Sequence, residues 1–151
     1  MNTKSIRTAR SSCMSISYDA IIEYVHPSLI HRLQKKCKLS ADSAIELFDD
    51  TKRFLYLCAD SNSRMTPPPA IDECWHHFIL FTKDYAEFCE RFLGGFVHHR
   101  PHYIGDPPSD ESTMFATIES ATRDFGILSK NWQFPEDFRS HCDKCAGCQA
   151  D

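Results

Sequence analysis

One run of apolar side chains, bounded by three prolines before it and two glycines after it, constrains the fold most strongly. The apolar residues recur at steps of three and four, which predicts an amphipathic helix over residues 71–93. The prolines at 67–69 cannot continue an earlier helix, and Gly94 and Gly95 are expected to end this one. We therefore expect a central helix that is buried on more than one side. Its apolar face would hold Ile71, Cys74, Trp75, Phe78, Phe81, Tyr85, Phe88, Cys89 and Phe92.

The rest of the chain predicts further helices, each starting near a residue that caps a helix or suits its first turn. The fold class that follows is all-α, a single compact domain of about five helices. The last of these helices would pack through a stripe formed by Met114, Phe115, Ile118, Ala121, Thr122 and Phe125. The predicted segments are residues 18–24, residues 28–37 with Pro27 in the first turn, residues 41–59 after Ser40, and residues 111–125 after Ser109 or Asp110.

Length and composition limit the chain to one domain. A sequence of 151 residues with 42% hydrophobic content supports a real core and leaves little room for a second one. We expect a flexible lead at residues 1–17, a helical domain at residues 18–138 and a Cys-rich tail at residues 139–151. Residues 131–138 either dock on the domain as a short turn or belong to the tail.

Charge and hydropathy argue against two classes of partner. The net charge of −4 disfavours a general nucleic-acid binder, and the basic cluster of Arg32, Lys35, Lys36 and Lys38 is interpreted as a solvated helix face. No stretch is long and apolar enough to span a membrane, and no charged-then-apolar leader opens the chain. We therefore expect a cytoplasmic protein with reduced thiols. The partner is unknown, and a protein partner remains open.

Histidines are concentrated in one short block. Residues 71–101 hold four of the eight histidines and two of the eight cysteines. Asp72 and His76 lie one helical turn apart, and a return of the chain after the glycines would bring His98 and His99 toward the helix. This pattern predicts a transition-metal site, zinc or iron, on His76 and His98 or His99, with Asp72 or Cys89 as a third ligand or a supporting residue. An open coordination position would favour hydrolytic chemistry.

The same block resembles the glycine-rich-domain-containing family, helical proteins of bacteria with longer multidomain relatives in plants. The resemblance covers residues 24–101 and implies a shared site, while no reaction is assigned to the block. Plant relatives, which are discussed as development and stress regulators with RNA-binding segments, tend to read W-H-x-H. Here Phe78 occupies the second histidine position and the extra histidine is His77. The residues that carry the resemblance are Asp72, Trp75, His76, Leu80, Tyr85, Cys89, Gly94 and one of His98 and His99.

The C-terminal tail contains a second candidate site. Cys142, Cys145 and Cys148 form a C-x-x-C-x-x-C pattern, with His141 upstream and Gly147 easing a tight turn. Thiolates at this spacing can hold one soft metal or an iron–sulfur cluster. The alternative interpretation is a redox-labile tail without fixed structure.

Three functions therefore remain open. The first is a metal-binding helical protein, whether or not it is an enzyme. The second is a metal- or redox-responsive interaction protein that acts through its tail. The third is a scaffold in which the histidines form a structural, proton-linked network without metal. An open pocket holding the histidine nitrogens would favour an enzyme, whereas histidines that are hydrogen-bonded and closed to solvent would favour a scaffold.

Overall fold

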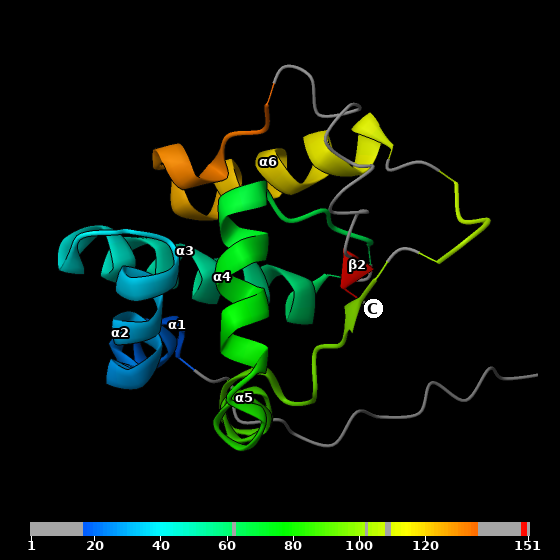
Figure 1. Ribbon diagram of the computed structural model, residues 1–151. Helices are drawn as coiled ribbons and strands as arrows, with labels where there is room; N and C mark the ends of the chain where they lie inside the picture. The colour runs from blue at the N-terminus through cyan, green and yellow to red at the C-terminus, as the bar shows by residue number, and fades with distance from the viewer. Residues whose placement is uncertain (1–16, 62, 102, 108–109, 136–148, 151) are drawn as a thin grey trace, which may run out of the picture.

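Six α-helices make up most of the residues that the structure describes, so the fold is all-α as predicted (Figure 1). This computed structural model describes residues 17–61, 63–101, 103–107, 110–135 and 149–150. The elements are α1 (Tyr18–Glu23), α2 (Pro27–Lys36), α3 (Ala41–Asp60), α4 (Pro69–Ile79), α5 (Thr82–Phe88), a π-helical turn η1 (Cys89–Leu93), β1 (His99–Arg100), α6 (Glu111–Phe125), a 3₁₀ turn η2 (Lys130–Trp132) and β2 (Gln149–Ala150).

Two of the predicted helix starts are confirmed by their caps. The Ser40 hydroxyl accepts a hydrogen bond from the Ser43 N–H at the start of α3. The Asp110 carboxylate accepts one from the Ser112 N–H at the start of α6. These bonds satisfy main-chain donors that have no partner inside their own helix. The local sequence therefore determines where these two helices begin.

The single helix expected over residues 71–93 is wrong, because the chain breaks at Leu80 and Phe81. Phe81 leaves the helical region with φ −85° and ψ 63°, and α5 then runs across the foot of α4 (Figure 1). Ten residues of straight helix would span about 15 Å. After the break, the Trp75 indole N–H lies 2.9 Å from the Tyr85 hydroxyl. The bend thus stacks the two halves of the apolar stripe on each other, which a straight helix could not do.

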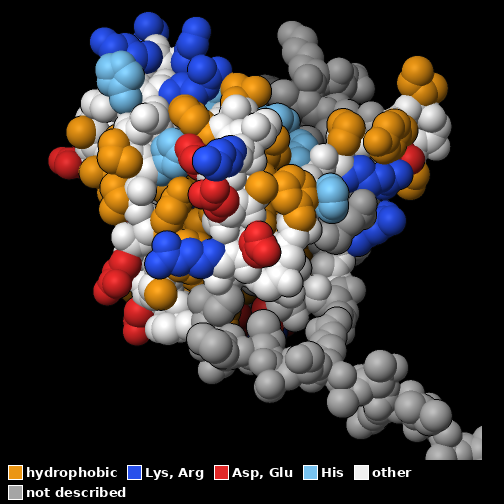
Figure 2. All heavy atoms as spheres, turned by 90° about the horizontal axis from the view of Figure 1, so that it is seen from below, with side chains coloured by type: hydrophobic (Ala, Val, Ile, Leu, Met, Phe, Trp, Pro, Cys, Tyr) orange, Lys and Arg blue, Asp and Glu red, His pale blue; other side chains and the backbone are white. Residues whose placement is uncertain are grey.

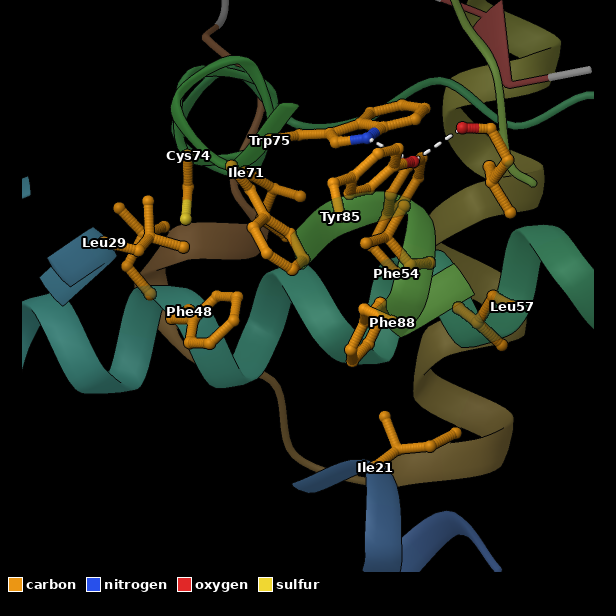
Figure 3. Packing of buried hydrophobic residues seen from close by; sticks show 14 of the residues in the cluster. Ile21, Leu29, Phe48, Phe54, Leu57, Ile71, Cys74, Trp75, Tyr85 and Phe88 are labelled. Atoms are coloured by element: carbon orange, nitrogen blue, oxygen red, sulfur yellow. Dashed lines mark hydrogen bonds between the residues drawn. The ribbon is translucent and has the colours of Figure 1, made fainter. Parts of the chain in front are cut away.

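The core lies where α3, α4 and α5 meet and is rich in aromatic rings (Figure 3). Phe78 of α4 contacts Phe48 of α3 and Tyr85 and Phe88 of α5, with ring centroids 5.1 to 5.3 Å apart. Burying one large apolar side chain contributes about 1.5–3 kcal/mol. The helix α4 is therefore covered on more than one side, as expected for a central element.

Two charged side chains of α3 are also buried and tie distant segments together. Lys52 donates to the main-chain carbonyls of Ile22 and Tyr24 at the end of α1, at 2.6 and 2.8 Å. The Asp50 carboxylate accepts from Ser129 at 2.6 Å and from Asn131 at 2.9 Å. Residues 130–132 therefore dock against α3, which answers the open question for the described part of residues 131–138.

The helix α6 packs through much of the predicted stripe, including Ala121, Ile118 and Phe125, but not through Phe115. Phe115 is 65% exposed, whereas Thr117 and Ala121 are fully buried. Thr117 donates its hydroxyl to the Thr113 carbonyl and accepts from the Thr66 N–H at 2.9 Å. Because these hydrogen bonds turn the threonines toward the core, Phe115 is left facing solvent.

The surface carries charges of both signs. Figure 2 shows one group of Lys and Arg side chains at an edge of the face seen from below, with further basic and acidic side chains interspersed over the rest. Lys35 and Lys36 occupy the last turn of α2, where the helix dipole favours positive charge. None of the described helices is long and apolar enough to cross a membrane.

Candidate metal centre

The helix α4 carries two carboxylate–histidine pairs side by side. Asp72 precedes His76 by four residues, and Glu73 precedes His77 by four residues. Side chains at this spacing lie one turn apart on the same helix face. The sequence D-E-C-W-H-H therefore presents two similar pairs in slightly different directions, and the neighbouring segments decide what each pair becomes.

The first pair meets a third residue from another segment. After Gly94, which adopts φ 74°, the chain returns and β1 places His99 against α4. His99 Nε2 lies 3.0 Å from Asp72 Oδ1, and the His76 and His99 ring centroids are 4.2 Å apart. One ligand atom from each of Asp72, His76 and His99 falls within 4.8 Å of the other two. The fold thus gathers one carboxylate and two imidazoles.

Hydrogen bonds define which ring nitrogens carry protons in this group. His76 Nδ1 lies 2.7 Å from the Asp72 main-chain carbonyl, which can only accept, so Nδ1 carries the proton. The lone pair of a neutral His76 is therefore on Nε2. A histidine that donates one N–H to a main-chain carbonyl and keeps the other nitrogen basic is the usual arrangement of a metal ligand.

The group is buried on one side and open on the other. The side chains of His99 and Asp72 are 9% and 13% exposed, whereas that of His76 is 46% exposed. The Trp75 ring contacts the His99 ring at a centroid distance of 4.5 Å, in an edge-to-face arrangement. Solvent therefore reaches the group from the His76 side, while Trp75 closes the opposite side.

Residues of α2 and of its C-terminal end contact the second pair. One ligand atom each from Cys37, Glu73 and His77 lies within 4.8 Å of the others. However, Arg32 Nε donates to His77 Nδ1 at 3.0 Å. Because a guanidinium can only donate, His77 Nδ1 must be the acceptor and Nε2 must carry the proton. In this second group, Arg32 therefore occupies the lone pair that a neutral His77 would offer to a metal.

The buried Nε2 atom of His77 has no well-aligned hydrogen-bond acceptor among the described residues. It lies 3.2 Å from Glu73 Oε1, but among the described residues no acceptor meets it at hydrogen-bonding angles. Burial raises the pKa of the Cys37 thiol, and the Glu73 carboxylate raises it further. The spacing of Glu73 and His77 could have indicated this group, but only the packing of α2 on α4 brings Cys37 and Arg32 to it.

A comparison with protein families assigns most of the chain to one family. The sequence model of a family described as UCP032817-like matches residues 17–130. The chain belongs to the UCP032817-like family. The region matched to this family contains all six α-helices and both groups of side chains on α4. Comparison with curated proteins and with solved structures finds no match.

Within the family region, two of the predicted site residues stand apart from the group on α4. His98 is exposed, and its ring contacts Phe96 at a centroid distance of 4.7 Å. Cys89 is fully buried beside Tyr85 and Val97, and burial raises the pKa of its thiol. The chain return thus presents His99 rather than His98, and it leaves Cys89 in the core. Cys142, Cys145 and Cys148 lie outside the described residues.

Proposed function

We propose that the protein binds a divalent transition metal, zinc or iron(II), through Asp72, His76 and His99. The observation that carries this proposal is the convergence of their ligand atoms within 4.8 Å from two separate segments. Two histidines and one carboxylate are a known ligand set for both metals. The tautomer of His76, with its proton on Nδ1, supports the same conclusion.

The accessibility of the group bears on its chemistry. Three protein ligands would leave positions for water on either metal, and a bound metal would make such a water more acidic. His76 is the most exposed of the three, so a small substrate would approach past this residue. The proposal extends to metal binding and leaves the substrate open.

A specific observation favours a second candidate, a structural histidine network without metal. His99 donates to the Asp72 carboxylate at 3.0 Å and is almost closed to solvent. This hydrogen bond links β1 to α4 without any metal. The two candidates differ in one respect: a metal centre gains stability from added metal, by about 2.7 kcal/mol at a hundredfold excess over Kd, whereas the network does not.

Three finer assignments are also proposals. A cytoplasmic location agrees with the free thiols of Cys37, Cys58, Cys74 and Cys89 among the described residues, since thiols stay reduced there. Kinship with the glycine-rich-domain-containing proteins rests on the motif residues around Trp75 and His76. A role for the cysteine tail rests on its spacing alone.

The deciding experiment compares neighbouring histidines. Tag-free protein would be titrated with Zn²⁺, and anaerobically with Fe²⁺, by calorimetry, with elemental analysis of the purified sample. We expect near one equivalent in the wild type, and loss of binding in His76→Ala and His99→Ala. The matched controls His77→Ala and His98→Ala should keep it, because neither residue belongs to the proposed centre.

Two results would contradict the proposal. One is the absence of binding of either metal to folded wild-type protein, which would leave the structural network. The other is equal loss in the control and test variants, which would point to nonspecific binding by histidines. A chain ending before Cys142 separates the contribution of the tail.

A further inference from the structure

A buried chain of hydrogen bonds runs from α4 through α5 to the segment that precedes β1. The Trp75 indole N–H donates to the Tyr85 hydroxyl at 2.9 Å, and that hydroxyl donates to the Val97 main-chain carbonyl (Figure 3). Trp75, Tyr85 and Val97 are at most 5% exposed. Three successive segments are therefore joined by hydrogen bonds to one buried oxygen atom.

The group at this point has two hydrogen-bonding tasks, and the Tyr85 hydroxyl performs both. It must accept from an indole N–H, which can only donate, and donate to a carbonyl, which can only accept. Burial raises the pKa of Tyr85 above its ordinary value, so the proton that reaches Val97 stays in place at neutral pH. Removing the hydroxyl would leave a buried donor and a buried acceptor without their partner.

This chain of hydrogen bonds joins the two halves of the proposed metal centre. On α4, Trp75 lies between Asp72 and His76 in sequence, and its ring contacts His99 at 4.5 Å. On the return segment, Val97 lies two residues before His99, a step of about 7 Å in extended chain. The position of the Val97 carbonyl therefore limits where the His99 ring can lie relative to α4.

Cys89 supports the same point from the other side. Its thiol is fully buried next to the Tyr85 hydroxyl and the Val97 main chain, and these two neighbours partly offset the rise in the thiol pKa that burial causes. This gives Cys89 a supporting role in the core, at a distance from the group on α4.

We propose that Tyr85 is the positioning residue of the centre: its hydroxyl, held between Trp75 and Val97, fixes the backbone that presents His99 to Asp72 and His76. The part that concerns metal rests on the proposed function. The part that concerns the position of His99 stands without metal.

The test uses Tyr85→Phe in the full chain, with Leu33→Ala as the control. Leu33 is fully buried in α2, so its truncation lowers stability without touching the hydrogen-bond chain. Both variants are studied at a temperature where circular dichroism shows them folded. The metal-free readout is the nuclear Overhauser effect between the Trp75 and His99 rings. The second readout is Zn²⁺ affinity by calorimetry.

We expect Tyr85→Phe to lose the Trp75–His99 contact and to bind Zn²⁺ about 10- to 100-fold more weakly, the range seen when a group that orients a ligand is removed. The control should keep both. A Tyr85→Phe protein with the ring contact and affinity of the wild type would overturn the proposal. If the wild type binds no metal, the proposed function fails, and the ring contact alone still decides the role of Tyr85.

A second variant covers the case in which Tyr85→Phe does not fold. Trp75→Phe removes the indole donor but leaves the bond between Tyr85 and Val97. We expect a smaller loss of Zn²⁺ affinity than the range given for Tyr85→Phe, yet a clear loss relative to Leu33→Ala. Unchanged affinity in folded Trp75→Phe would contradict the role of the hydrogen-bond chain.

Discussion

His76 and His77 are consecutive residues with opposite hydrogen-bond partners. The Nδ1 of His76 donates to a main-chain carbonyl, and the Nδ1 of His77 accepts from Arg32. The first arrangement leaves a basic Nε2, and the second puts a proton on that atom. Two residues of the same type on one helix therefore differ in chemistry because of what packs against each.

Burial also determines the protonation of the Cys74 thiol. Burial raises the pKa of Cys74 to about 12, whereas an unperturbed thiol titrates near 8.5. The thiolate is the reactive form. At pH 8 we therefore expect iodoacetamide to modify native Cys74 at least ~100-fold more slowly than the same residue in urea. Peptide mass spectrometry gives both rates, and among the four cysteines in the described part of the chain half-buried Cys37 should be labelled first.

The pH dependence of the labelling rate tests whether the raised pKa of Cys74 is the cause of its slow reaction. Between pH 8 and pH 10 the rate for unfolded Cys74 should level off, while the native rate should keep rising with hydroxide concentration. Because the native state holds this proton to higher pH than the unfolded chain, the stability from Cys74 is present below pH ~8.5 and is lost as the pH rises above it. A native rate that levels off near pH 9 would show that the thiol titrates normally.

At the scale of elements, His26 joins two helices. Its Nδ1 accepts from the Leu29 N–H as the N-cap of α2, and its Nε2 lies 2.9 Å from Asp84 Oδ2 on α5. Since the first contact needs a lone pair on Nδ1, the Nε2 atom carries the proton and donates to Asp84. A neutral histidine thus caps the N-terminus of α2 and also links α2 to α5 through a hydrogen bond.

Substitutions at His26 separate these two contributions. His26→Ala removes both, and we expect a loss of about 1–2 kcal/mol in the free energy of unfolding. His26→Asn keeps a cap acceptor and loses the bond to Asp84, which is half exposed and contributes less than about 1 kcal/mol. The ring contacts to Phe78 and Phe81 are lost in both variants, so the difference between them reports the cap. Urea unfolding measures both values. Equal losses in the two variants would mean that the cap contributes little.

At the scale of the whole molecule, Asp50 connects the middle of α3 to the segment after α6. Its carboxylate is 1% exposed and accepts from Arg53, Ser129 and Asn131. Removing one member of such a buried set leaves the others unsatisfied. Ser129 and Asn131 are therefore held on α3 by one carboxylate, and Trp132 next to them in sequence is buried in the core.

Asp50→Ala should therefore destabilise the protein by about 3–5 kcal/mol. Glu46 on the same helix provides a control, because its carboxylate is exposed and its removal should change stability by less than about 0.5 kcal/mol. Chemical unfolding of Asp50→Ala and Glu46→Ala, monitored by tryptophan fluorescence and by circular dichroism, would compare the two variants. Similar losses for both would contradict the role given to Asp50.

Local sequence predicted the elements better than their arrangement. The caps at Ser40 and Asp110 are encoded within three residues of each helix start, so the boundaries of α3 and α6 could be read directly. Phe115 was placed on the wrong face because threonine hydrogen bonds, rather than apolar area, turn α6 toward the core. The break at Phe81 has no proline or glycine to announce it.

The sequence by itself determined the helical class, most helix starts, and the pairing of Asp72 with His76, because these depend on contacts within a few residues. Only the tertiary structure decided that His99 rather than His98 reaches that pair, and that Arg32 takes the lone pair of His77. The first outcome depends on the bend between α4 and α5 and on the chain return, and the second depends on the packing of α2 against α4. Both involve hydrogen bonds between segments far apart in the chain, for which local spacing carries no signal.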